Sequence, residues 1–167
     1  AIEAASVTAM DYPDINWIFM GGGRDEANIR NRAEKLGLIN KNVFFIGRKP
    51  AEDVCKYLSV CDAALLILKD MPLLNITLPA KIQSYFACGI PVIASCSGEG
   101  AETVKKAQAG ITCEAENPKK LAEIAISMYN SKDDDRNSMR EKALSYFETN
   151  YKKEKLMDLL EEVIEEV

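Results

Sequence analysis

The segment spanning residues 74–94 constrains the fold of this chain more than any other. Pro79 can occupy the first turn of a helix, where its missing N–H costs nothing, and no residue of 80–87 breaks a helix. Gly89 ends that helix, and the apolar run behind it suits a buried strand of a parallel sheet. The sequence therefore predicts loop, helix, tight turn and strand, with Lys81 at a helix start, where anions bind.

The same alternation of strand and helix runs along the rest of the chain. Further apolar strands are predicted near residues 16–20, 43–46, 61–68 and 111–113. Further helices are predicted near residues 1–10, 25–35, 51–58 and 102–108. Continuous apolar strands separated by helices predict a doubly wound α/β domain, in which helices cover both faces of a parallel sheet and form three layers (α/β/α).

Sheets of this kind bind ligands outside the carboxyl ends of their strands. Four segments of the chain would meet at that edge: residues 21–23, 47–49, 69–79 and 95–100.

The chain is helical from Asn117 onward, and residues 131–167 are expected to form a C-terminal helical segment. Its last helix carries an apolar stripe between lysines and glutamates: Leu156, Leu159, Leu160, Val163 and Ile164. This stripe packs either on the same domain or on a neighbouring molecule in a crystal, or on a partner domain.

Length, composition and charge limit the classes of protein to which this chain can belong. The 167 residues are of one-domain size, with 47% hydrophobic and 28% charged residues, as in an ordinary soluble globule. Net charge is −5 and the basic residues are scattered among acids, which disfavours nucleic acid or anionic lipid as a partner. No stretch approaches the roughly 18 consecutive apolar residues of a membrane span, and no signal sequence opens the chain. Residues 1–10 read as a helix already under way, with no initiator Met, so we expect a piece of a longer protein.

The five cysteines and the absence of histidine limit the kinds of catalytic and metal sites that this chain can contain. Five cysteines, an odd number without a C-x-x-C pair, predict reduced thiols in a cytosolic protein: Cys55, Cys61, Cys88, Cys96 and Cys113. Because the chain contains no histidine, a His-containing triad and the common zinc and haem sites are excluded. No carboxylate cluster typical of a Mg²⁺ site is present either, so no metal is expected.

A glycine run follows the strand predicted at 16–20. Gly21, Gly22 and Gly23 do not complete a G-x-G-x-x-G motif, because Glu26 stands where the third glycine should be, and this disfavours an NAD site. The run either makes a turn that needs positive φ or lines a cleft where backbone approaches a ligand.

Taken in order, these pieces resemble the donor-binding half of retaining glycosyltransferases of the large family 4 type (glycosyl transferases group 1). Those enzymes have the GT-B fold, in which two Rossmann-like domains clasp a nucleotide-sugar. The resemblance covers roughly residues 15–130 and rests on segments 20–23, 36–38, 43–48, 61–66, 74–94, 109–111 and 117–122.

The resemblance implies a donor site. Its expected members are Gly22, Gly23, Arg48, Lys49, Thr77, Leu78, Pro79, Ala80, Lys81 and Ser84. In relatives the backbone just after the strand that corresponds to residues 43–46 holds the nucleobase. Arg48 and Lys49 therefore either contact the base or are solvated charges. The helix start at 78–81 is similar to a subgroup with Pro-x-Lys, found among bacterial transferases that build surface polysaccharides from UDP-activated sugars. In that subgroup the diphosphate meets free backbone N–H groups and the lysine.

The chain departs from the family at two positions. Many members carry two glutamates eight positions apart, and Ile76 and Ser84 stand at those positions here. Ser84 can still hydrogen-bond to ribose, whereas Ile76 cannot. Glu102 matches the glutamate of a Gly-Gly-x-x-Glu turn, and we expect it to charge the start of the next helix. The sequence assigns no catalytic residue.

The resemblance thus implies the C-terminal, donor-binding domain of a cytoplasmic retaining glycosyltransferase. Its expected partners are a nucleotide-sugar, UDP-sugar in the first place, and its own N-terminal acceptor domain; no cofactor and no nucleic acid are expected. The whole enzyme would build bacterial surface or lipid-linked glycans, and any membrane contact, peripheral at the inner face, would come through the N-terminal half. Without the family's first strand and its Arg/Lys pair, we expect the isolated chain to have no transferase activity and weak nucleotide affinity.

Two alternatives remain at this point. A UDP-sugar 2-epimerase shares the GT-B fold, but it is expected to need histidine in this half, and none is present. A non-catalytic flavodoxin-like receiver or binding module needs clustered aspartates, whereas Asp62 precedes its predicted strand and Asp70 follows it alone.

Overall fold

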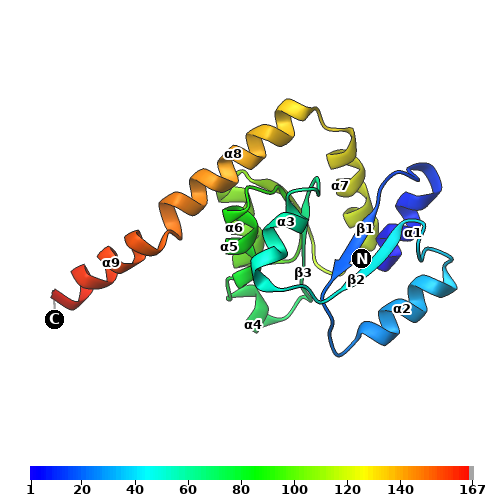
Figure 1. The fold of residues 1–167 in the computed structure, drawn as a ribbon, viewed down its shortest axis with the longest axis horizontal. Helices are drawn as coiled ribbons and strands as arrows, with labels where there is room; N and C mark the ends of the chain where they lie inside the picture. Colours follow the sequence, from blue (N-terminus) through cyan, green and yellow to red (C-terminus); the bar gives the residue numbers. More distant parts are fainter. Residues whose placement is uncertain (166–167) are drawn as a thin grey trace.

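The computed structural model describes residues 1–165 as an α/β domain with a long helical tail (Figure 1). The strands are β1 (Trp17–Met20), β2 (Val43–Gly47), β3 (Ala64–Ile67), β4 (Val92–Ser95) and β5 (Gly110–Cys113). The helices before β4 are α1 (Ile2–Asp11), α2 (Glu26–Lys35), the 3₁₀ turn η1 (Ala51–Asp53), α3 (Val54–Leu58), α4 (Pro72–Asn75) and α5 (Ala80–Ala87). Those after β4 are α6 (Glu99–Ala107), α7 (Pro118–Asn130), α8 (Asp133–Asn150) and α9 (Lys153–Glu165).

All strand pairs are parallel, which confirms the predicted α/β class. The strands form two ladders, β1-β2 and β3-β4-β5. Trp17 lies opposite Val43 in the first ladder, and Val92 lies opposite both Ala64 and Gly110 in the second. Within residues 1–165 no strand hydrogen bond joins the two ladders.

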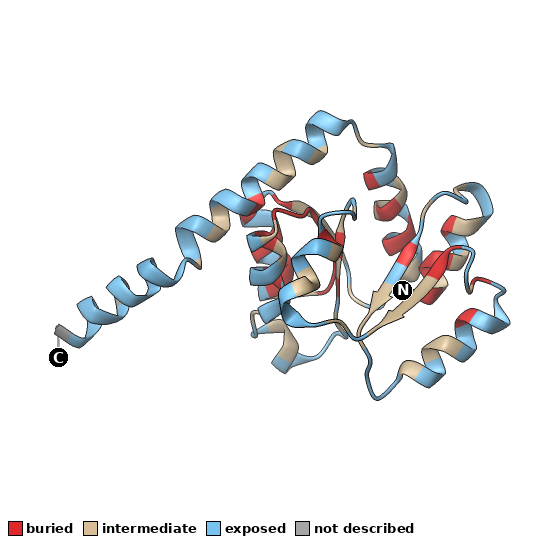
Figure 2. Ribbon diagram, in the orientation of Figure 1, coloured by how far each residue is buried: buried red, intermediate tan, exposed pale blue. Residues whose placement is uncertain are grey.

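The two ladders share one hydrophobic core. On one face α1 packs against α7, and α7 packs on β4 and β5. The Trp17 indole N–H donates to Oγ1 of Thr8 at 3.1 Å, which fixes β1 to α1. On the other face Ile82 and Phe86 of α5 are fully buried against the second ladder. β4 is buried along its whole length, and Figure 2 shows the buried residues spread over the helices and strands of the domain and absent from the described part of the last helix. The helices therefore cover the faces of the second ladder and leave its strand ends open to a ligand.

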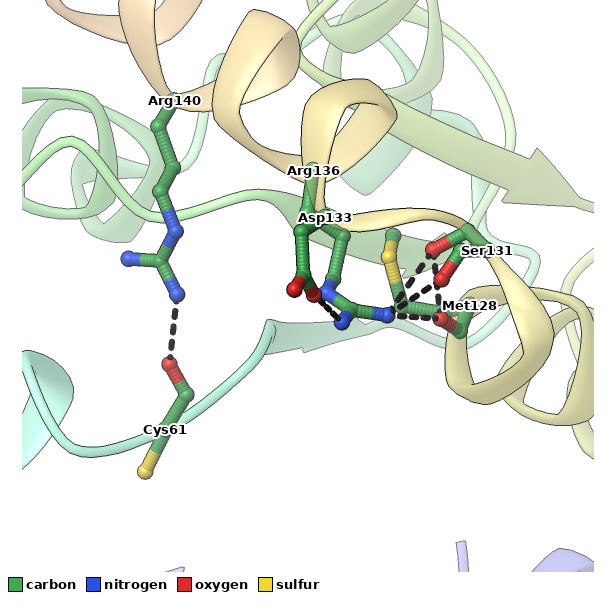
Figure 3. A network of polar contacts seen from close by, with 6 residues as sticks. All are labelled: Cys61, Met128, Ser131, Asp133, Arg136 and Arg140. Carbon is green, nitrogen blue, oxygen red and sulfur yellow. Dashed lines mark hydrogen bonds and ion pairs between the residues drawn. The ribbon is translucent and has the colours of Figure 1, made fainter.

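Helix α8 fastens the tail to the domain. It packs on α5, where Gly89, with φ of 58°, leaves no room for a Cβ beside the Leu144 side chain. Arg136 donates to the carbonyl of Ser131 at 2.7 Å, and Arg140 donates to the carbonyl of Cys61 at 3.1 Å (Figure 3). The last of the tail, by contrast, is not fastened in this way.

Helix α9 extends away from the domain beyond α8 (Figure 1). Its large apolar side chains are 45–64% exposed: Leu156, Met157, Leu160, Val163 and Ile164. The alternative that this stripe packs on the same domain is therefore wrong for these residues. The side chain of Leu159 and residues 166–167, which belong to the predicted helical segment, lie outside the described part of the chain. No helix in residues 1–165 combines the length and apolar character needed to cross a bilayer.

Several predicted boundaries shift. Pro79 precedes α5 as its N-cap instead of lying in the first turn. The predicted loop at 69–79 contains the short helix α4, which starts with Pro72. Helix α6 begins at Glu99, three residues before the predicted start, because Gly98 takes the N-cap position with a positive φ of 69°.

The prediction of five reduced cysteines is wrong for one pair. Cys55 of α3 and Cys88, the C-cap of α5, form a disulfide with a Cα–Cα distance of 5.6 Å. Cys61, Cys96 and Cys113 are free. The two bonded residues are 33 positions apart, so their proximity arises from the packing of α3 beside α5 and not from local sequence.

Candidate functional site

The ends of β1 and β2 bring together the first group of expected donor residues. The backbone N–H of Gly21 donates to the carbonyl of Gly47 at 2.8 Å, which ties the two strand-end loops. A methyl group placed on Gly22 would lie 3.6 Å from Nε of Arg48, so these two residues are neighbours. Gly22, Gly23 and Arg48 are exposed. The positive φ that the sequence predicts for this turn occurs at Gly21, at 117°.

Lys49, next to Arg48, is directed toward α3. Its ammonium lies 5.3 Å from the ring centroid of Tyr57. A cation over an aromatic face is attracted by the ring quadrupole, by about 0.5–1 kcal/mol where solvent has access. Lys49 is half-buried as a result, whereas Arg48 stays open to solvent.

The end of β3 and the start of α5 bring together the second group. Thr77, Ala80, Lys81 and Ser84 are exposed, and Leu78 and Pro79 are half-buried. Helix α5 has no side-chain cap, and the N–H of Ile82 already bonds to the carbonyl of Pro79 at 3.0 Å. The N–H groups of Ala80 and Lys81 have no hydrogen-bond partner among residues 1–165. An uncapped helix start with a cation in its first turn is suited to an anion.

A contact that the sequence did not predict holds this second group in place. A Cβ on Gly98 would overlap the carbonyl of Asn75, the last residue of α4. Asn75 in turn donates through Nδ2 to Oδ1 of Asp70 at 2.8 Å, and the N–H of Asp70 points at Oε2 of Glu116 at 3.5 Å. The loop from β3 to α5 thus rests on the turns that follow β4 and β5. The sequence signal was Gly98 itself, in a segment expected at the carboxyl edge.

The structure brings the ten expected residues into two groups and not into one. Gly22, Gly23, Arg48 and Lys49 belong to the β1-β2 ladder. The residues from Thr77 to Ser84 belong to the β3-β4-β5 ladder. No hydrogen bond or ion pair within residues 1–165 joins the loops of one ladder to those of the other. Both groups lie at the carboxyl ends of parallel strands, where such a sheet binds ligands.

The positions at which the chain departs from its family are also open to solvent. Ile76 is 76% exposed at the end of α4, and Ser84 is exposed on α5. Glu102 lies in the first turn of α6 and pairs with Lys105 at 2.9 Å. The hydrogen bond from the Lys105 ammonium holds the pKa of the Glu102 carboxyl below its usual range. Glu102 therefore places a negative charge at a helix start, as the sequence predicted.

The groups available at this edge suit a phosphate-bearing ligand. Among the ten expected residues they are backbone N–H groups, two lysines, one arginine and the hydroxyls of Thr77 and Ser84, and exposed Lys69 at the start of the 69–79 loop adds a further cation. The described residues include no cluster of metal-ligating side chains. Glu26, whose Oε2 lies 3.0 Å from a Cβ placed on Gly22, already pairs with Arg30 at 2.9 Å.

Comparison with known proteins assigns the family. Residues 1–146 match the family described as "Glycosyl transferases group 1", and the chain therefore belongs to this family. Over 134 residues it is 31% identical to the GDP-mannose-dependent monoacylated alpha-(1-6)-phosphatidylinositol monomannoside mannosyltransferase of Corynebacterium glutamicum. That match covers 76% of this chain and 33% of the relative, so the chain spans about a third of the length of that protein. Family membership favours a transferase over the epimerase and the receiver-like module.

Solved structures with the same fold support the architecture. The Anabaena protein Alr3699/HepE in complex with UDP superimposes with a TM-score of 0.83 at 18% identity, over 99% of this chain and 44% of that one. A second match, with a TM-score of 0.72 at 22% identity, is the C-terminal domain of a glycosyl transferase group 1 family protein (LpcC) from Francisella tularensis. It covers 91% of this chain and 77% of that one. At these identities the likeness concerns the fold, the Rossmann-like architecture of GT-B glycosyltransferases.

Proposed function

We propose that this chain is the donor-binding domain of a retaining glycosyltransferase and that it takes a UDP-sugar. The observation that carries the proposal is the start of α5. Two backbone N–H groups without a partner in residues 1–165 meet Lys81 there, at the carboxyl end of a parallel ladder. This is where the departing diphosphate would bind.

The proposed chemistry follows from the charge that develops as the glycosidic bond breaks. The diphosphate gains negative charge in the transition state, so fixed N–H dipoles and an ammonium stabilise that state more than the ground state. Ser84 follows Lys81 by three residues and lies on the same side of α5, which suits a hydrogen bond to ribose. The loop that carries Arg48 and Lys49 would contact the base.

The choice of nucleotide, the biological role and the location of the acceptor site are each supported by a different observation. One relative is named for GDP-mannose, and one structural neighbour was solved with UDP. We favour UDP because residues 78–81 resemble the Pro-x-Lys subgroup, and the same resemblance supports a role in bacterial polysaccharide or glycan synthesis. Since the chain covers 33% of the Corynebacterium protein, the acceptor site is assigned to another part of a longer enzyme.

Ligand-observed NMR with UDP, GDP and ADP tests the proposal. We expect binding of UDP, weakened about tenfold by Lys81→Ala, as for the loss of a charge-assisted hydrogen bond. Lys35→Ala is the matched control, because Lys35 is an exposed lysine in the last turn of α2, away from the proposed site. Binding of GDP alone would mean that the donor is a GDP-sugar and not a UDP-sugar. Binding of none of the three, or equal effects of the two alanine variants, would contradict a donor site at α5.

A further inference from the structure

The disulfide between Cys55 and Cys88 includes one residue that is exposed to solvent. Cys55 is exposed on α3, and Cys88 is half-buried at the end of α5. Of the free cysteines, Cys96 is only 2% exposed, and Cys61 and Cys113 are half-buried. Thiol–disulfide exchange requires access to a sulfur atom, so the bonded pair is a site where exchange can occur.

Helix α3 has few other attachments to the domain. Of its five residues, only Leu58 is buried, in a small cluster with Ala64 and Ile90, and partly buried Val54 packs against the same cluster. The next anchor along the chain is the bond from Arg140 to the carbonyl of Cys61, at 3.1 Å (Figure 3). The disulfide is therefore a major constraint on the position of α3 relative to α5.

Of the two bonded helices, α3 contacts a cation of the first group of the candidate site, and α5 carries a cation of the second group. Tyr57 of α3 lies beside the Lys49 ammonium, 5.3 Å from the ring centroid. Lys81 lies in the first turn of α5. No hydrogen bond or ion pair among the described residues joins these two groups directly. The covalent link through Cys55 and Cys88 thus helps to fix where Lys49 stands relative to Lys81.

We propose that Cys55 and Cys88 form a reversible thiol–disulfide exchange site whose oxidation state sets the nucleotide affinity of the donor site. This inference rests on the proposed function. The co-reactant is a low-molecular-weight disulfide of the glutathione type. One cysteine thiolate attacks it and expels a thiolate; the second cysteine then attacks the mixed disulfide, closes the Cys55–Cys88 bond and expels a second thiolate. Two cysteine thiols are oxidised, one external disulfide is reduced to two thiols, and the two protons pass to the leaving thiolates.

The test combines mass spectrometry with nucleotide titration of the whole chain. The chain is equilibrated with reduced or oxidised glutathione, its free thiols are alkylated, and its mass is measured. The affinity for UDP is then determined in each state. We expect the Cys55–Cys88 bond to form and break reversibly, and the oxidised chain to bind UDP at least about fivefold more tightly, the lower end of ordinary coupling between sites. The double variant Cys55→Ser with Cys88→Ser should bind like the reduced chain under both conditions.

Cys113→Ser is the matched control, because it removes a free thiol from β5 and leaves the disulfide in place. It should respond to glutathione like the unmodified chain. No disulfide at any glutathione ratio, or equal UDP affinity in both states, would overturn the switch alone. Absence of UDP binding in both states would instead contradict the proposed function, and the mass measurement distinguishes the two failures.

Discussion

Gly98 fixes the loop that leads into α5. Its φ of 69° favours glycine, and an added Cβ would overlap the Asn75 carbonyl. Gly98→Ala should therefore lower the free energy of unfolding by about 1–3 kcal/mol, the usual cost of a strained backbone position, and also weaken UDP binding. Urea denaturation measures the first effect. Gly37→Ala is the control, since Gly37 also has a positive φ, of 66°, but nothing lies within 4 Å of a Cβ there, and equal losses in both variants would contradict the role of the Asn75 contact.

Tyr85 hydrogen-bonds to the backbone of β3. Its hydroxyl donates to the carbonyl of Leu65 at 3.2 Å, and burial raises the pKa of this phenol. Tyr85→Phe should cost about 1 kcal/mol of unfolding free energy, the typical net value of one such bond. Tyr129→Phe, at an exposed ring on α7, should change stability by less than about 0.5 kcal/mol in the same denaturation experiment. A neutral Tyr85→Phe would show that the bond to Leu65 contributes nothing net.

At the scale of the element, β1 has one paired and one unpaired edge. The N–H of Trp17 donates to the carbonyl of Asn42 at 2.7 Å, and backbone groups alternate sides along a strand, so those of Ile18 and Met20 point away from β2. Hydrogen exchange followed by NMR should find the amides of Ile18 and Met20 fast and those of Trp17 and Phe19 slow. Equal protection of all four would mean that another strand pairs with this edge in solution.

The disulfide should also stabilise the domain. Cys55 and Cys88 are 33 residues apart, and the chain-entropy model gives up to about 4 kcal/mol for closing a loop of that size. The double serine variant should lose a large part of this free energy, which thermal or urea unfolding without reductant would detect. Identical unfolding curves for the two chains would contradict a stabilising disulfide.

At the scale of the whole molecule, the domain and the last helix are energetically separate. The described large apolar side chains of α9 are 45–64% exposed, and an isolated helix of this length is marginal in water. Deletion of residues 153–167 should therefore change the unfolding free energy of the domain by less than about 0.5 kcal/mol. A larger loss in calorimetry would show that α9 packs on the domain in solution.

The fold was predictable because its signals are local. Apolar runs predicted all five strands, and Gly89 predicted where α5 ends. The features that could not be predicted depend on contacts between residues that are distant in sequence. The pairing of Cys55 with Cys88 spans 33 positions, and the close approach of Gly98 to the carbonyl of Asn75 exists only after α4 and α6 have packed. The division of the strands into two ladders is likewise a property of the assembled sheet.

The candidate site was predictable in its parts and not in its arrangement. Because strand ends share one edge of a parallel sheet, the loops at 21–23, 47–49 and 69–79 were expected together. The sequence could not reveal that Arg48 and Lys81 would belong to separate ladders, since strand order is not written in local pattern. It also missed Tyr57, whose ring holds Lys49.

The most direct test of the donor site is a titration of the ¹⁵N-labelled chain with UDP. The account predicts that the amides of Ala80 and Lys81 shift most, with smaller shifts in residues 47–49, and that Lys81→Ala weakens the response. Shifts confined to other parts of the molecule, or none at millimolar UDP, would contradict a nucleotide-sugar site at the start of α5.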